Sequence, residues 1–168
     1  MLSLLIALPN NTMLLVAGVR SRFKDVDSLV AFLKKQPFAA QAFDADSVFR
    51  ELLVFAHYHA IKAFGEGTNR ARSLPAEMLL WAAGTSKIDR ALERVGVRHP
   101  SQAVIAADCS EQEGKELLRQ LGERDDSLLE LTPAKADRLL AGVDKSLRER
   151  YSVEELLLER AAMLSAQA

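Results

Sequence analysis

The sequence predicts an α+β fold, with residues 1–168 forming a single domain in which a mixed or antiparallel sheet packs against several helices. Short apolar runs typical of strands occur at the start, in the middle and late in the chain. Between them lie many helical patterns bounded by proline and glycine. Strands and helices do not alternate regularly, which argues against a doubly wound parallel sheet. A chain of 168 residues, 49% of them hydrophobic and 27% charged, is large enough for one core.

Five segments have the composition of strands. Residues 2–7 and 13–19 are apolar runs separated by the turn-forming sequence PNNT, so we expect them to pair as a hairpin. The apolar start lacks the basic residues that precede the apolar part of a signal peptide, which favours a strand there. The expected strands are residues 2–7, 13–19, 39–43, 102–107 and 127–131.

Seven segments have helical patterns. Their first residues are those that cap or open helices, and several end at glycine. The second is apolar nearly all round, which favours a central core helix, and we expect Asp44 and Asp46 to cap it. The expected starts are Asp25 or Asp27, Asp46 or Ser47, Pro75, Thr85 or Ser86, Glu111, Thr132 and Ser152; the ends lie near Leu33, Phe64, Gly84, Gly96, Leu121, Gly142 and Leu164.

Two of these helices carry further local signals. Ser86 with Asp89, and Ser152 with Glu155, have the spacing of capping boxes. In the helix that ends at Gly96, four apolar residues at helical spacing predict a buried stripe. These four are Ile88, Ala91, Leu92 and Val95.

Little in the sequence suggests catalysis, and we expect no metal or cofactor. His57 and His59 are two apart on one helix, so their side chains diverge and cannot share an ion. Cys109, the single cysteine, has acidic neighbours that disfavour a reactive thiolate and no partner for a disulfide. No apolar run is long enough to cross a membrane. These features favour a cytoplasmic protein.

Basic residues concentrate in one part of a chain whose net charge is only −1. From residue 69 to residue 98 there are six basic residues against three acids, whereas residues 108–130 hold eight acids against three basic residues. Arg70 and Arg72 lie in the connector GEGTNRARS, which we expect to be flexible because of Gly65 and Gly67. This asymmetry predicts one face suited to anions.

The helix expected to end at Gly96 adds to the predicted basic face. At about 100° per residue, Lys87, Arg90 and Arg94 fall on one flank of the apolar stripe. The start of the Pro75 helix adds backbone N–H groups suited to a phosphate. Solvated helices also carry such charges without binding anything, and Arg94 near a helix C-terminus is favourable by itself.

The segment from residue 68 to residue 97, TNRARSLPAEMLLWAAGTSKIDRALERVGV, resembles the small kinase-associated subunit of the KEOPS complex, the family that includes the PRPK-binding protein. The motif consists of a basic loop, a helix of the form ExLx(aromatic)xxG, here from Glu77 to Gly84, and then IxxA(L/I)xxxG(I/V), here from Ile88 to Val97. The resemblance is clearest between residues 47 and 109.

The resemblance implies a non-catalytic protein that binds the small atypical kinase of the complex and the 3′ CCA end of tRNA, meeting the other subunits indirectly. The complex installs threonylcarbamoyladenosine on tRNA. Leu158 in the last helix is a candidate kinase contact, as is the long apolar helix, while Trp81 either stacks on a base or packs in the core. The implied RNA contacts are Asn69, Arg70, Arg72, Ser73, Lys87 and Arg90.

Two other interpretations stay open at this point. The first is a small enzyme or binding protein that uses the Arg70 and Arg72 loop to hold a phosphorylated metabolite. The second is a scaffold that associates with itself and has no RNA role. Salt-dependent tRNA binding would separate an RNA-binding protein from both, since phosphate contacts weaken steeply as salt is added.

Overall fold

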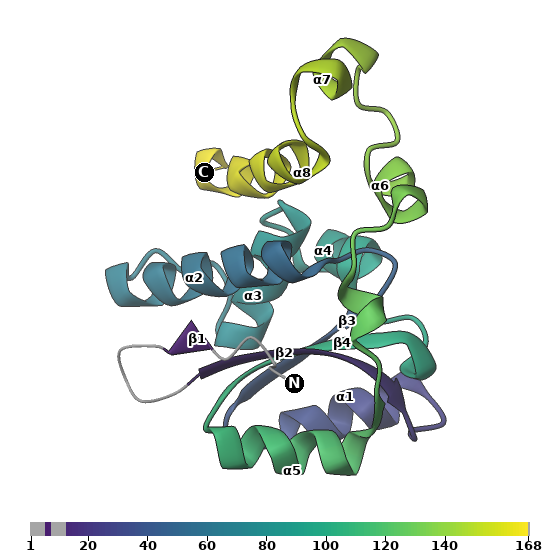
Figure 1. Ribbon diagram of the computed structural model, residues 1–168. Coiled ribbons are helices and arrows are strands. Elements are labelled where there is room, and N and C mark those ends of the chain that lie inside the picture. Colours follow the sequence, from purple (N-terminus) through teal and green to yellow (C-terminus); the bar gives the residue numbers. More distant parts are fainter. Residues whose placement is uncertain (1–5, 8–12, 168) are drawn as a thin grey trace.

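The computed structural model describes residues 6–7 and 13–167 and shows an antiparallel sheet with helices on both faces (Figure 1). Its strands are β1 (Ile6–Ala7), β2 (Met13–Ser21), β3 (Ala39–Asp44), β4 (Ala103–Cys109) and β5 (Gly122–Arg124). The order is β1-β2-β4-β3, and β5 also pairs with β2. Every pairing is antiparallel, for example Val16 with Ala106. The α+β prediction and the pairing of the first two strands are confirmed, while the PNNT turn lies outside the described residues.

The eight α-helices of the described residues cover both faces of this sheet. Helices α1 and α5 lie on one face, α2 and α3 cover the other, and α8 lies over α2 as a further layer (Figure 1). No described helix is both long and apolar enough to span a membrane. Their bounds are α1 (Val26–Lys34), α2 (Arg50–Glu66), α3 (Leu74–Ala83), α4 (Ile88–Val95), α5 (Glu111–Leu121), α6 (Pro133–Leu139), α7 (Lys145–Arg150) and α8 (Val153–Ala162).

Alternation along the strands divides the core into two clusters. On β2, Leu14 and Val16 pack toward α2 and α3, whereas Leu15 and Ala17 pack toward α1 and α5. Successive strand residues point to opposite faces, so a sheet covered on both sides reads as a continuous apolar run. The larger cluster also includes residues of α6 and α8 such as Leu157, and it therefore ties the C-terminal helices to the rest of the molecule.

The long helix begins later than the sequence predicts. Helix α2 starts at Arg50, with Phe49 as its N-cap and no side-chain cap. The predicted caps have other partners: Asp44 accepts hydrogen bonds from Ser47 and Arg98, and Asp46 from Arg138 at 3.0 Å. The prediction that Asp44 and Asp46 cap this helix is wrong, because the chain between β3 and α2 forms a polar turn that these bonds hold.

In the second half of the chain one prediction is wrong and one helix was not predicted. Residues 127–131 are not a strand; instead a 3₁₀ helix spans Asp126–Leu129, and Asp125 caps it by accepting a hydrogen bond from the backbone N–H of Ser127. The strand of this region is β5, which lies just before it. The sequence also gave no indication of α7, a short helix capped by Asp144.

Helix α4 differs from its prediction at both its start and its stripe. Its N-cap is Lys87, and no Ser86–Asp89 capping box forms, because the backbone N–H of Ser86 donates to the side chain of Gln167 at 3.1 Å. Only Ala91 and Val95 of the stripe are buried, whereas Ile88 and Leu92 are 42% and 50% exposed. The capping box of α8, in contrast, is confirmed by reciprocal hydrogen bonds between Ser152 and Glu155.

Candidate nucleic-acid interface

The loop that carries the arginines runs from residue 67 to residue 73, between α2 and α3, and is held rather than free. Gly67, in the left-handed conformation at φ 68°, ends α2, so Gly65 belongs to the helix. The carboxylate of Glu77, which is fully buried, accepts hydrogen bonds from the backbone N–H groups of Arg70 (2.8 Å) and Ala71 (2.7 Å). The expectation of a flexible connector is therefore wrong.

The guanidinium of Arg70 connects this loop to the C-terminal segment. Its Nη2 donates to the backbone oxygens of Leu164 (3.0 Å) and Gln167 (2.8 Å), although the residue stays exposed. The side chain of Gln167 in turn donates to the oxygen of Gly84 and accepts from the N–H of Ser86. This segment therefore bridges the arginine loop and the start of α4, which brings Arg70 and the Lys87 end of α4 into one region.

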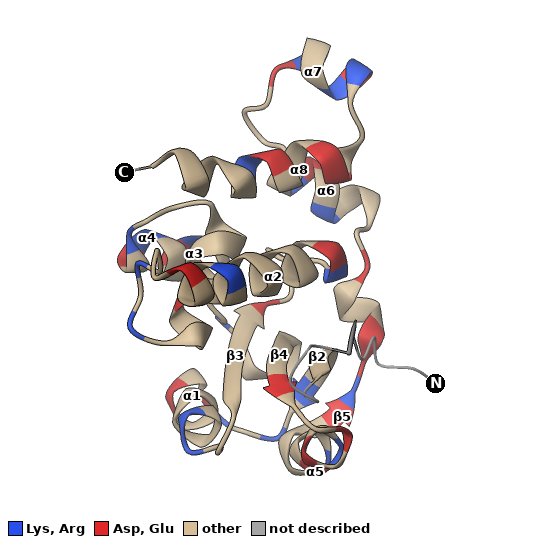
Figure 2. Cartoon of the chain, turned by 90° about the vertical axis from the view of Figure 1, so that its left-hand side faces the viewer, with Lys and Arg blue, Asp and Glu red and all other residues tan. Residues whose placement is uncertain are grey.

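Three of the predicted contacts are cations without a protein partner. Arg72, Lys87 and Arg90 are exposed, and their side chains form no hydrogen bond or ion pair with any residue the structure describes. Arginine and lysine side chains in this condition are available to bind anions. They lie on the arginine loop and on α4, away from the acidic helix α5 (Figure 2). The basic and acidic stretches of the sequence are thus separated in space as well.

The two remaining predicted contacts are arranged differently. Asn69 is half-buried, and its side-chain amide donates to the backbone oxygen of Ala71 at 2.9 Å, which shapes the loop. Ser73 is the N-cap of α3 and lines a separate pocket with Pro75, toward α1 and β3. A second pocket, beside Arg70, is lined by residues of α2 and α3, and the structure does not bring Ser73 into it.

That pocket, of about 370 Å³, contains residues that the sequence reasoning missed. His59 stacks on the indole of Trp81 with ring centroids 4.6 Å apart and planes at 26°, and Lys62 stands beside it one turn along α2. Trp81 itself is only 5% exposed and donates to Glu77, so it packs in the core. The spacing of His59 and Lys62 on one helix face was the available signal.

The imidazole of His59 is suited to stacking rather than to ion pairing. Burial, and then the positive charge of Lys62, lower the pKa of His59 below its usual value. The ring is therefore neutral at neutral pH. A neutral ring above a buried indole can hold a flat aromatic group, while the charge of Lys62 at the same pocket is partly balanced by Glu66, 4.0 Å away.

The residues considered for metal or nucleophilic chemistry are structural. His57 is buried, and its Nε2 lies 3.3 Å from Oδ2 of Asp108 on β4. Burial raises the pKa of the Cys109 thiol to about 11, with smaller effects from Glu113 and Asp108, so it is protonated at neutral pH. Over the described ranges, no group of three or more His, Cys, Asp or Glu could hold a metal ion.

Leu158, the candidate kinase contact, is half-buried on α8 and packs against the main core cluster. Part of its side chain is therefore open at the surface. On α2, Tyr58 is 62% exposed, so the long helix also presents an apolar group to solvent. Both surfaces named from the sequence are accessible.

The fold and the site define a small α+β protein in which an aromatic pocket lies beside a hydrogen-bonded loop, together with exposed cations that have no partner among the described residues. The chain belongs to a family described as kinase binding protein CGI-121, whose model matches residues 23–162. The chain is 31% identical to the KEOPS complex subunit Cgi121 of Pyrococcus abyssi (strain GE5 / Orsay) over 98 residues. These residues are 57% of this chain and 56% of that protein. The match thus spans just over half the length of this relative. The resemblance noted in the sequence is confirmed.

Proposed function

We propose that this protein is a non-catalytic subunit of the KEOPS complex that binds its small kinase and the 3′ CCA end of tRNA, and so supports threonylcarbamoyladenosine modification. Membership of a kinase-binding family and similarity to a KEOPS subunit support the assignment of this chain to that complex. The observation that carries the RNA role is that Arg72, Lys87 and Arg90, on the arginine loop and α4, are exposed and have no side-chain partner among the described residues.

The arrangement suits a single-stranded RNA end. Such ends are held by phosphate contacts and by stacking of bases on flat side chains. Arg72, Lys87 and Arg90 would contact phosphates, and the pocket formed by His59, Lys62 and Arg70 would take a base. Asn69 would act by shaping the loop, and Ser73 would contribute least because it faces another pocket.

The RNA role is tested by measuring the affinity for tRNA with and without its CCA end, over a series of salt concentrations. We expect removal of CCA to weaken binding more than a changed anticodon loop does. Arg72→Gln with Lys87→Gln and Arg90→Gln should flatten the salt dependence by up to about one unit of slope per lost phosphate contact. The triple variant Lys24→Gln, Lys34→Gln and Lys35→Gln is the matched control, because these three lysines are also exposed and have no side-chain partner among the described residues. Equal binding of tRNA with and without CCA would contradict end recognition.

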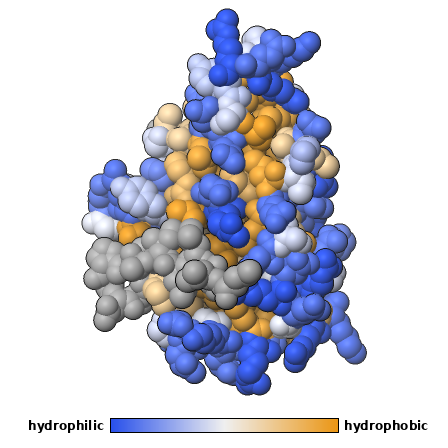
Figure 3. All heavy atoms as spheres, viewed as in Figure 1, coloured by the Kyte–Doolittle hydropathy of each residue, from blue (hydrophilic) through white to orange (hydrophobic). Residues whose placement is uncertain are grey.

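The kinase is proposed to dock on the C-terminal helices. Hydrophobic residues gather along the middle of the face in Figure 3. In and around α6, α7 and α8, the half-buried apolar side chains that pack against the main core cluster include Leu131, Leu139, Val143, Val153 and Leu158. An apolar patch of this kind marks a protein interface.

Leu158→Glu tests the kinase surface. We expect loss of co-purification with the kinase while tRNA affinity is retained, with circular dichroism to confirm that the variant folds. Tyr58→Glu on α2 is the companion variant, since α2 is the other candidate surface. If Tyr58→Glu alone abolishes co-purification, the kinase docks on α2 instead.

The phosphorylated-metabolite interpretation of the arginine loop has less support. Glu77 already occupies the N–H groups of Arg70 and Ala71, and carbonyl oxygens occupy the guanidinium of Arg70. A small phosphate at this loop would have to displace these bonds. The phosphates of an extended RNA would contact the exposed cations Arg72, Lys87 and Arg90 instead and would leave these bonds in place.

A further inference from the structure

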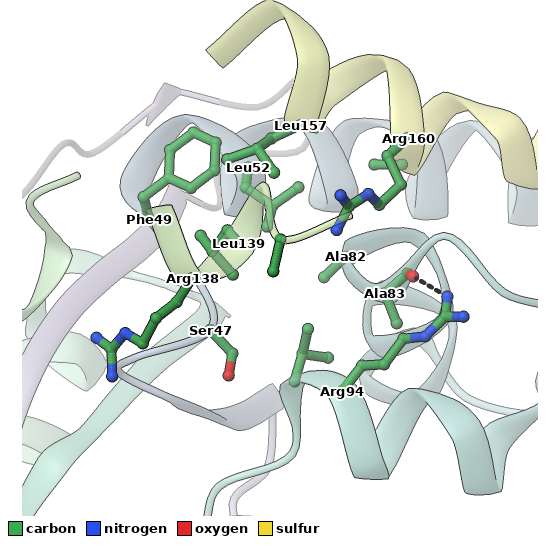
Figure 4. Close-up of a pocket in the computed structure, with 13 residues that line it drawn as sticks. Ser47, Phe49, Leu52, Ala82, Ala83, Arg94, Arg138, Leu139, Leu157 and Arg160 are labelled. Carbon is green, nitrogen blue, oxygen red and sulfur yellow. Dashed lines mark hydrogen bonds between the residues drawn. The ribbon is translucent and has the colours of Figure 1, made fainter. Parts of the chain in front are cut away.

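A second group of arginines surrounds a pocket that has no part in the proposed RNA site. The pocket, of about 400 Å³, lies where α2, α3, α4, α6 and α8 meet. Arg160 extends into it from α8 and Arg94 from α4, beside Ala82 and Ala83, while hydrophobic residues lie at its other end (Figure 4). These hydrophobic residues include Phe49, Leu52, Leu139 and Leu157.

Arg94 and Arg160 bring two positive charges that no carboxylate of the described residues neutralises. Arg94 donates only to the backbone oxygen of Ala83, at 3.0 Å, and Arg160 has no hydrogen bond or ion pair within the described part of the chain. Burial lowers the pKa of Arg160, and the charge of Arg94 lowers it further, yet arginine stays charged at neutral pH. Both residues are exposed, so water screens part of the repulsion between their like charges, and an anion bound between them would remove the remainder.

The charge of the third arginine at the pocket, Arg138, is neutralised by an ion pair. Arg138, on α6, donates to Asp46 at 3.0 Å, and its guanidinium lies away from the other two in Figure 4. The unbalanced charge of the pocket therefore comes from Arg94 and Arg160 alone. A group with two negative charges would neutralise it, whereas a carboxylate would leave half of it.

We propose that this pocket binds an organic phosphate monoester whose phosphate lies between Arg94 and Arg160 and whose apolar or aromatic body lies against Leu139 and Ala141, the accessible apolar residues of the lining. A phosphate monoester carries a charge close to −2 at neutral pH, and its oxygens match the planar donors of guanidinium groups. Inorganic phosphate has no apolar group, so it would contact the arginines but not the apolar end of the pocket. The residues involved are distinct from Arg72, Lys87 and Arg90.

Phenyl phosphate is the probe, with benzoate and inorganic phosphate as comparisons, titrated into the full chain by calorimetry and by NMR. We expect phenyl phosphate to bind at least about tenfold more tightly than either comparison. The NMR signals of Ala82, Ala83 and Leu157 should shift. Equal affinity for benzoate, or for inorganic phosphate, would overturn the assignment, as would shifts confined to the arginine loop.

Variants assign the contacts. Arg94→Gln and Arg160→Gln should each weaken phenyl phosphate binding about tenfold or more, and Arg160→Lys should weaken it less because the charge remains. Arg119→Gln, at an exposed arginine paired with Glu116 on α5, is the matched control. Thermal melting confirms folding of each variant. Unchanged affinity in a folded Arg94→Gln, Arg160→Gln double variant would overturn the proposal, and tRNA binding, which uses other residues, is expected to persist in it.

Discussion

Arg70 donates two hydrogen bonds to the backbone of a segment more than ninety residues away, at Leu164 and Gln167, so the arginine loop and the C-terminal segment hold each other in place. Gln167 extends this connection to Gly84 and Ser86 at the turn between α3 and α4. An exposed arginine that the sequence suggests as an RNA contact is thus also a structural link. Its two roles can be separated by measuring stability and RNA affinity on the same variants.

Arg70→Ala should lower the free energy of unfolding by about 1 to 2 kcal/mol, because hydrogen bonds from a charged group contribute roughly this much when partly exposed. Arg72→Ala should leave stability unchanged within about 0.5 kcal/mol, since Arg72 has no partner in the described residues. Urea denaturation measures both. In a double-mutant cycle with Gln167→Ala, Arg70→Ala should have a non-additive effect; full additivity would contradict the link.

Glu77→Ala should destabilise the protein by about 3 kcal/mol or more. The fully buried carboxylate accepts from Arg70, Ala71 and the indole of Trp81, and its removal leaves these donors without partners. Denaturant unfolding gives the magnitude. Amide hydrogen exchange at Arg70 and Ala71 should accelerate in the variant, whereas the amides of α5, on the opposite face of the sheet, should change only with global stability. Unaltered exchange at both amides would show that the loop is held in another way.

Stability should fall as the pH is lowered below about 6.5, because of His57. Burial lowers the pKa of this side chain in the folded state, and the raising effect of Asp108 only partly offsets it. The unfolded chain therefore binds more protons than the folded chain between the folded pKa and the unfolded value near 6.5. The contribution of His57 to the free energy of unfolding is constant above that pH window and is lost as the pH falls through it.

Melting temperatures at several pH values between 5 and 8 measure this effect. His57→Gln should flatten the pH dependence, at some cost in stability near pH 7. The pKa of His59 is lowered as well, so His59→Gln is the companion variant that separates the two contributions. A profile that His57→Gln leaves as steep as in the wild type would contradict the assignment.

Local signals in the sequence were sufficient for most of the fold. Helix α3 starts near Pro75 and ends at Gly84, α5 spans the predicted residues, and α8 forms its capping box, because each feature depends on residues a few positions apart. The apolar β4 run likewise predicted a buried strand. Short-range hydrogen bonding and backbone geometry are readable from a single sequence.

The errors arise where distant residues compete with a local pattern. The backbone N–H of Ser86 is bound by Gln167, which is 81 positions away, so the expected capping box does not form. Ile88 and Leu92 have helical spacing with the buried residues, but the packing of α4 against the rest of the fold leaves both exposed. The aromatic pocket also escaped the sequence reasoning, since the stacking of His59 on Trp81 depends on how α2 packs against α3. None of these contacts has a signature within one segment.

Glycine substitutions test how closely α8 approaches the turn after α3, and with it the position of Arg160. Gly84 has φ +65°, and a Cβ added there would lie 2.6 Å from the backbone oxygen of Arg160. Gly84→Ala should therefore destabilise by about 2 kcal/mol or more, from left-handed strain together with displacement of α8. Gly67, at φ +68°, has open space around it, so Gly67→Ala should cost only the strain, about 1 kcal/mol.

Gly65 completes this comparison, because it lies inside α2 with nothing within 4 Å of an added Cβ. Gly65→Ala should stabilise the protein by up to about 1 kcal/mol, as alanine is the better helix former. Denaturant unfolding should thus rank the three variants from Gly65→Ala, the most stable, through Gly67→Ala to Gly84→Ala. If Gly84→Ala costs no more than Gly67→Ala, α8 does not press on the turn, and the close approach that positions Arg160 beside Ala83 is not maintained in solution.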